Sequence, residues 1–205
     1  PPTAGPLGSP PTAAGDHQRF DDVTQRGGVP LAKFPSPPMI PWSAHDDLPA
    51  YGPNLERARE LVEQSAYDGE DVALHVSSDT PHMQLIATRM QERFAEIGVS
   101  STVRQFGRGS FYTTEQKADS NLTLIELGSI NGAADYLVRL QFHSEGGDNA
   151  ALHESEGTGL YNLGPEVDDL IETGDRALDE ETKHEAYREV QQRVMEQGVL
   201  VPIYY

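Results

Sequence analysis

The sequence contains no cysteine, and its 205 residues include only 15 basic residues against 33 acidic ones. Without cysteine, the protein has no disulfides, no thiol catalysis and no thiolate metal sites. The formal net charge of -18 repels phosphate backbones and anionic lipids, which disfavours binding to nucleic acid or to a membrane surface. Only three of the basic residues are lysines (Lys33, Lys117 and Lys183). High acidity together with few lysines indicates adaptation to high salt; an ordinary acidic surface is the alternative interpretation.

Long apolar runs are also missing. No stretch approaches the roughly 20 apolar residues that span a bilayer, and neither an initiator methionine nor a signal-like region opens the chain. The opening residues PPTAGPLGSPPTAAG are typical of a cut inside a longer protein, so we expect a fragment. Prolines crowd residues 1–48, which predicts an extended crossing segment without regular helix or central strand, packed through Phe34, Met39, Ile40 and Trp42.

No motif for catalysis, a metal or a cofactor is present. The seven histidines form no HExxH or similar metal-ligand spacing. His153-Glu-Ser155-Glu-Gly157 differs from a nucleophile elbow in its first residue and lies in a polar loop. Gly107-Arg-Gly109 lacks the third glycine and the lysine of phosphate-binding loops. We therefore expect no enzyme, no metal site and no cofactor.

Apolar spacing predicts an α/β fold over the rest of the chain. Strands 72–78 and 99–106 flank a helix that starts at Pro81 and stops at Gly98, so they are expected to pair in parallel. The alternation in 72–78 places Val72, Leu74 and Val76 on one face. Before this unit, a helix capped by Asn54 is expected to run to about 66. After it, we expect a helical piece at 111–116, a strand at 122–127, a helix at 134–142 and a surface loop at 143–164. The chain then continues with a helix from Pro165 that has Ala177 and Leu178 on its apolar face, a helix at 180–197 closed by Gly198, and a buried strand at 199–205.

The polar loop after strand 122–127 is the strongest candidate for a binding site. In open α/β sheets, ligands bind beyond the carboxyl ends of the strands, and Gly128-Ser-Ile-Asn-Gly132 occupies that place. An ordinary surface loop is the alternative. The candidate ligand-binding residues are Leu127, Gly128, Ser129, Ile130 and Asn131, with Tyr112 and Trp42 as weaker candidates; for Trp42 a core role is the main alternative.

Three segments, in order, resemble the family 5 extracellular solute-binding proteins, the peptide- and nickel-binding receptors of ABC importers. They are YGPNLERARELVEQSAYDG at 51–69, MQLIATRMQERFAEIGVSSTV at 83–103, and the closing block from Tyr161. That block contains a Val-Asp pair, a helix of Tyr-x-x-x-Gln type and a Val-Pro-x-Tyr ending. The resemblance implies the second lobe of a type II periplasmic-binding-protein-like fold over 49–205, with a mixed sheet flanked by helices. It also implies a last strand that returns to a first lobe, ABC permease subunits as partners, and a place outside the cytoplasmic membrane, periplasmic or lipid-anchored.

The same resemblance bears on the ligand. Peptide-binding members carry Trp-Gly at this loop, an Asp two residues later that pairs with the ligand's amine, and then Asp-Pro. Aligned on Gly128, this chain has Leu127, Ile130 and Ala133-Ala134 there. A buried ammonium without a counter-charge costs several kcal/mol, so the usual grip on the amine is lost unless Asp135 replaces it; Asp135 equally suits a helix start.

The expected function is delivery of a small solute, most simply a peptide, to an ABC importer. A receptor of the same family for a nickel chelate or a sugar is one alternative. An acidic protein-interaction domain is another. A hydrolase is disfavoured because no convergent cluster of titratable residues is evident.

Overall fold

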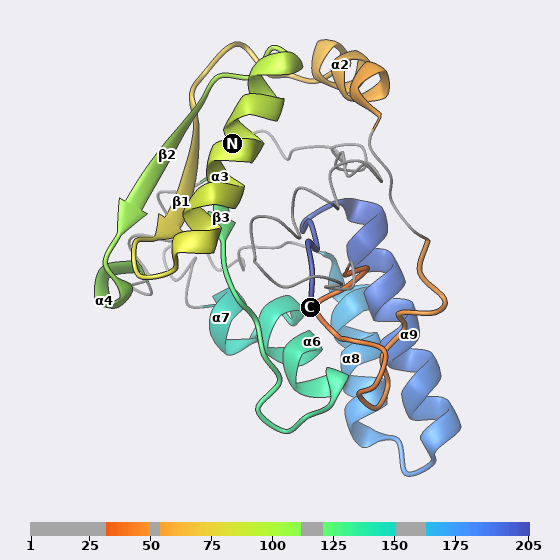
Figure 1. The fold of residues 1–205 in the computed structure, drawn as a ribbon. Coiled ribbons are helices and arrows are strands. Elements are labelled where there is room, and N and C mark those ends of the chain that lie inside the picture. Colours follow the sequence, from red (N-terminus) through yellow and green to blue (C-terminus); the bar gives the residue numbers. More distant parts are fainter. Residues whose placement is uncertain (1–31, 50–53, 112–120, 151–162) are drawn as a thin grey trace. The chain divides into compact units, whose positions relative to one another are not determined.

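The computed structural model describes residues 32–49, 54–111, 121–150 and 163–205 (Figure 1). The chain divides into two compact units. The sheet unit contains the described residues 54–111 and 121–126, and the helical unit contains the other described residues.

The sheet unit is built on three parallel strands in the order β2-β1-β3. These are β1 (Val72–Ser77), β2 (Ser101–Phe106) and β3 (Leu122–Leu124). The parallel pairing of β1 with β2 confirms the predicted β-α-β unit. All pairings of the described strands are parallel, so the antiparallel part of the expected mixed sheet is not found among the described residues.

The central strand shows why alternation was the wrong pattern for β1. Ala73, His75 and Ser77 are buried together with Leu74 and Val76. A strand with a neighbour on each side and covered faces is buried throughout, so the two faces predicted from the sequence do not differ.

Helices α2 (Leu55–Gln64) and α3 (Pro81–Glu96) of the sheet unit follow their predicted ends. Asn54 caps α2 by accepting a hydrogen bond from the Arg57 amide at 2.8 Å. Pro81 occupies the first turn of α3, and Gly98 follows this helix with a φ of +83°, a conformation that favours glycine. Buried residues of α3 lie on the predicted stripe: Met83, Ile86 and Ala87.

Two predicted elements differ in extent. β3 ends at Leu124, because its pairing with β1 stops at Val76 opposite Leu124, whereas the prediction continued to Leu127. The short helix α4 (Arg108–Phe111) lies before the expected helical piece, most of which falls outside the described residues.

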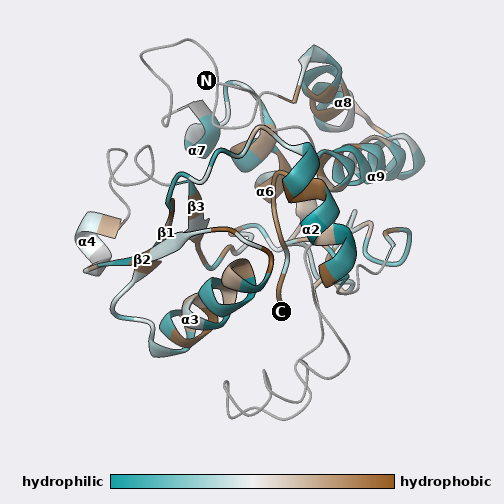
Figure 2. Cartoon of the chain, turned by 90° about the horizontal axis from the view of Figure 1, so that it is seen from above, coloured by the Kyte–Doolittle hydropathy of each residue, from teal (hydrophilic) through white to brown (hydrophobic). Residues whose placement is uncertain are grey.

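The helical unit packs α6 (Ala134–Phe142), α8 (Pro165–Arg176) and α9 (Glu180–Gln197) against one another (Figure 1). The bounds of α6 and α9 are those predicted. Figure 2 shows α9 as a largely hydrophilic ribbon, and its buried residues form a narrow stripe: Ala186, Tyr187, Val190, Gln191, Val194 and Met195. No helix among the described residues is both long and apolar enough to cross a bilayer.

Three predictions for the helical unit were wrong. The expected loop 143–164 contains the short helix α7 (Gly147–Ala150), in which the buried Asn149 side chain donates to the His143 carbonyl at 3.0 Å. Leu178, expected on the apolar face of its helix, is fully exposed because α8 has ended before it. The segment 199–205 is partly exposed and not a buried strand, since its pairing among described residues is limited to one bridge at Tyr204 and a bond from Ala32 to Ile203.

The proline-rich segment 32–49 consists of bends and turns, as proline density predicts. Phe34 is fully buried, with its ring centroid 5.7 Å from that of Phe142. Met39, also expected to pack, is 79% exposed, because it lies in a turn that points it into solvent.

We predict an acid-dependent weakening of α9 at its first turn. Asp179 accepts a hydrogen bond from the Thr182 amide at 2.8 Å, and this bond holds the pKa of the carboxyl below its ordinary value of 3.8. A lowered folded pKa means that the stabilisation is present above the ordinary value and is lost as pH falls through the folded value. Thermal unfolding of Asp179→Asn, which keeps a neutral cap, should depend less on pH in this acid range than unfolding of the wild type; equal pH profiles would contradict the assignment.

Candidate functional site

The 127–133 loop, which joins β3 to α6, is closed by its own polar side chains. The Ser129 hydroxyl donates to the Ala133 carbonyl at 2.5 Å and accepts from the Ala133 amide at 3.1 Å. Asn131 Oδ1 also accepts from the Ala133 amide, at 3.1 Å. Gly132 takes a φ of +72°, where a side chain is disfavoured. The loop is therefore a compact turn with a defined backbone.

The Ile130 side chain points outward from the loop. It is 84% exposed, whereas Ser129 is partly buried and bonded within the loop. Gly128 is exposed, and a Cβ at this position meets nothing within 4 Å. A molecule that reaches this loop meets an aliphatic side chain and open backbone around Gly128.

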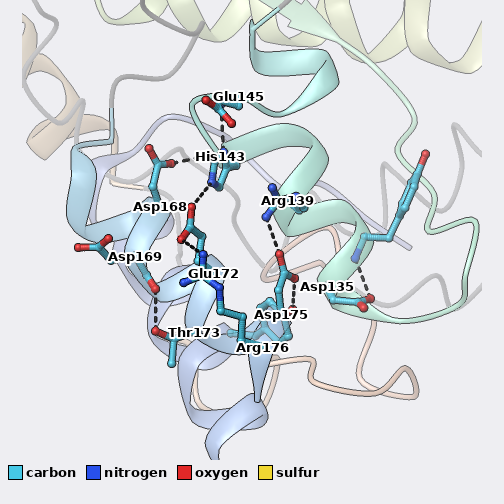
Figure 3. A network of polar contacts seen from close by, with 12 residues as sticks. Asp135, Arg139, His143, Glu145, Asp168, Asp169, Glu172, Thr173, Asp175 and Arg176 are labelled. Carbon is cyan, nitrogen blue, oxygen red and sulfur yellow. Dashed lines mark hydrogen bonds and ion pairs between the residues drawn. The ribbon is translucent and has the colours of Figure 1, made fainter. Parts of the chain in front are cut away.

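Asp135 serves the start of α6. Its Oδ1 accepts from the Tyr136 amide at 2.7 Å and from Asn131 Nδ2 at 2.9 Å; Figure 3 shows where Asp135 lies. Ala133, the N-cap residue, makes no side-chain capping bond, so Asp135 supplies the negative charge that a helix N-terminus favours. This geometry supports the helix-start interpretation of Asp135 over its use as a substitute ligand-binding carboxylate.

Helix α6 is tied to α8 and α9 by a polar chain of three residues. Arg139 pairs with Asp175 at 2.5 Å (Figure 3), and the Tyr187 hydroxyl donates to the other carboxylate oxygen of Asp175 at 2.6 Å. Burial, followed by the hydrogen bond to Asp175, raises the pKa of Tyr187. The phenol therefore stays a proton donor over the physiological range.

Trp42 adopts a left-handed backbone conformation with a φ of 60°. Its indole N–H donates to Glu180 Oε2 at 2.8 Å, and its ring centroid lies 5.9 Å from that of Tyr187. Lys183 Nζ lies 4.7 Å from the centre of the Trp42 ring, within reach of a cation–π contact. The Trp42 ring is therefore partly buried, and its contacts with Glu180, Tyr187 and Lys183 hold it in place.

A second polar group surrounds His143, the residue after α6. His143 is 3% exposed in its side chain, with Asp168 Oδ1 3.9 Å from Nδ1 and Glu172 Oε1 3.7 Å from Nε2 (Figure 3). The Glu145 amide donates to Nδ1 at 3.0 Å, and Asp168 accepts from the Ser144 amide at 2.8 Å. These bonds fasten the end of α6 to α8. In the described ranges, no group of three or more His, Asp or Glu side chains has a geometry suited to a metal ion.

The structure thus places the sequence-predicted candidates in two positions. Leu127 through Asn131 form one continuous loop, while Trp42 lies in the proline-rich segment beside α9. Tyr112 falls outside the described residues. Tyr187 and Gln191 were not among the candidate residues predicted from the sequence, although their Tyr-x-x-x-Gln spacing is part of the family resemblance.

A family model and a curated relative both match this chain to solute-binding proteins. Residues 16–149 match the model of "Bacterial extracellular solute-binding proteins, family 5 Middle". The chain is 24% identical over 190 residues to "Probable di/tripeptide-binding protein 5" of Pseudomonas aeruginosa, covering 92% of this chain and 35% of that relative.

Solved structures of low identity share the fold. The Helicobacter pylori ABC transporter-associated periplasmic binding protein DppA, in complex with the peptide STSA, has a TM-score of 0.77 at 16% identity, over 92% of this chain and 36% of that one. Campylobacter jejuni NikZ, in complex with Ni(L-His), has a TM-score of 0.73 at 18% identity, over 93% of this chain and 39% of that one. The chain therefore has the α/β fold of a periplasmic-binding-protein lobe and spans little more than a third of these proteins' lengths.

Proposed function

The chain belongs to the family 5 bacterial extracellular solute-binding proteins, and from this premise we propose that it is the ligand-binding lobe of a receptor that delivers a peptide to an ABC importer. The observation that carries the proposal is the family match over residues 16–149. A relative named as a probable di/tripeptide-binding protein and a similar structure in complex with the peptide STSA support a peptide over other solutes. The receptor binds and releases its ligand without catalysis, outside the cytoplasmic membrane, periplasmic or lipid-anchored, and its partners are the permease subunits.

We further propose that the 127–133 loop faces the ligand through Leu127, Gly128 and Ile130. Ser129 and Asn131 shape the loop, since their polar atoms bond to Ala133 and, for Asn131, also to Asp135. Trp42 is a second contact, held in place by α9. The carboxylate oxygen of Asp135 that faces the loop is occupied by two N–H donors. The loop therefore suits an uncharged or aliphatic group of the peptide better than its ammonium.

This loop chemistry predicts that the full-length receptor binds free and N-acetylated forms of one tripeptide with affinities within about threefold of each other. The reason is that residues 127–133 include no carboxylate that could pair with the ligand's ammonium group. Isothermal titration in molar salt checks the result. A preference of about a hundredfold for the free amine would show that a carboxylate pairs with it. Binding of nickel chelates or sugars, but not of peptides, would favour the alternative ligands.

A substitution at the loop tip tests the location of the site. Ile130→Asp should raise the preference for the free amine by about tenfold or more, because Ile130 aligns with the position whose Asp pairs with the ligand's amine in peptide-binding members. Leu178→Asp is the matched control, since Leu178 is also a highly exposed aliphatic residue (104%, against 84% for Ile130) but lies between α8 and α9. If the two variants change the preference equally, the 127–133 loop is not the contact.

A further inference from the structure

The Tyr-x-x-x-Gln spacing of α9 has a structural role that ligand contact does not explain. Tyr187 and Gln191 lie one helical turn apart, so their side chains share a face. Both are 0% exposed. Burying a carboxamide lowers stability unless its polar atoms are hydrogen-bonded. The hydrogen-bond partners of Gln191 therefore indicate its structural role.

Gln191 bonds to two peptide groups of the proline-rich segment. Its Oε1 accepts from the Ala44 amide at 3.1 Å, and its Nε2 donates to the Trp42 carbonyl at 2.8 Å and to the Tyr187 carbonyl at 2.9 Å. Both N–H donors and the oxygen of the carboxamide are thereby used. The side chain thus fixes the backbone on both sides of Ser43.

The backbone that Gln191 fixes is an unfavourable one. A φ of 60° is a genuine outlier for a residue as bulky as Trp42, and such conformations persist only where the surroundings over-determine them. The surroundings here are Gln191 at the carbonyl, Glu180 at the indole nitrogen and the Tyr187 ring beside the indole.

The residue before Trp42 is bonded to the start of α6. The Pro41 carbonyl accepts from the Ala134 amide at 3.0 Å, which satisfies one of the N–H groups that a helix leaves free at its N-terminus. Ala134 directly follows Ala133, whose amide is held by Ser129 and Asn131. A contiguous path of bonds therefore runs from Gln191 through the segment 41–44 to the 127–133 loop.

We propose that Gln191 is a positioning residue of the 127–133 loop, which acts through Trp42 and Pro41 without touching the ligand. Gly174 makes the arrangement possible, because a Cβ there would lie 2.8 Å from the Tyr187 ring. The role in ligand binding rests on the proposed function; the mechanical link between Gln191 and the loop does not.

The test compares Gln191→Leu with Gln192→Leu in the full-length receptor. Gln192 is the next residue of α9, is only partly buried, and provides the same chemical change away from the segment 41–44. In Gln191→Leu, amide hydrogen exchange measured by mass spectrometry should become about tenfold faster or more in peptides covering 41–44 and 127–137. Affinity for the tripeptide should fall by about tenfold or more, while Gln192→Leu matches wild type.

Gln191→Met keeps the side-chain length, removes the same three hydrogen bonds and places no charge at this fully buried position, so it guards against a variant that fails to fold. It is expected to show the same two regions of faster exchange. Faster exchange at 41–44 with unchanged exchange at 127–137 would overturn the proposal, as would a loss of affinity equal to that of Gln192→Leu. Failure of the wild type to bind any peptide would refute the proposed function instead, and the exchange data would still decide whether Gln191 positions the loop.

Discussion

Replacing Gly146 with alanine is expected to lower the free energy of unfolding by at least about 3 kcal/mol, the upper end of the usual cost of overpacking. An added Cβ would lie 2.3 Å from the Arg139 carbonyl oxygen, 2.6 Å from that of Leu140 and 2.9 Å from that of His143. These are backbone atoms at the end of α6, which cannot move aside as a flexible side chain can. The urea midpoint of unfolding measures the loss.

Gly128→Ala is the control for this substitution. Nothing lies within 4 Å of a Cβ at Gly128, and its φ is not in the left-handed region. Its free energy of unfolding should stay within about 0.5 kcal/mol of the wild type. Equal unfolding midpoints for the two variants would mean that the chain does not approach the end of α6 closely at Gly146.

Tyr187→Ala is expected to cost about 3–5 kcal/mol of stability, as for other large aromatic side chains removed from a core. The side chain is fully buried, faces the Trp42 ring and fills the space left by Gly174. Its hydroxyl joins the Arg139–Asp175 pair to α9. Chemical denaturation with tyrosine-independent detection by far-UV circular dichroism gives the difference.

Tyr187→Phe separates packing from the hydrogen bond. Phenylalanine keeps the ring but removes the donor to Asp175, whose carboxylate retains Arg139. The expected cost is about 1.5 kcal/mol, typical of a hydrogen bond to a charged group. If the alanine variant were no less stable than the phenylalanine variant, the ring would not be part of the core.

Elements with local signals were predicted from the sequence. Helix α9 ends at Gln197 because Gly198 adopts the left-handed conformation, with a φ of 66°, that stops a helix. It starts at Glu180 because Asp179 caps its first turn. Gly198 predicted the end of the helix from the sequence, because a glycine directly after a helix can be recognised without knowledge of the rest of the fold.

Features that depend on distant partners were not predicted. The full burial of β1 requires knowing that β2 and β3 flank it on either side. The conformation of Trp42 depends on Gln191, which is 149 positions away in the chain. The exposure of Met39 depends on how the turn around it is oriented. Apolar periodicity reports which residues suit burial, and it carries no information about which partner covers them.

For the candidate site, the sequence identified the loop but not its internal chemistry. Glycines at 128 and 132 around three small or medium side chains marked a tight turn at a strand end. The hydrogen bond from Asn131 to Asp135 could not be predicted from the sequence, because it depends on where α6 starts relative to the loop. That bond engages one carboxylate oxygen of Asp135, which bears on the ligand chemistry proposed for the loop.

Photo-cross-linking tests whether the 127–133 loop contacts the bound peptide. A tripeptide with a diazirine near its N-terminus is bound to the full-length receptor, irradiated, and its attachment sites are mapped by mass spectrometry, with excess unlabelled tripeptide as competitor. Competed adducts are expected within residues 127–131. Saturable binding with adducts confined to other parts of the chain, and none in this loop, would contradict it.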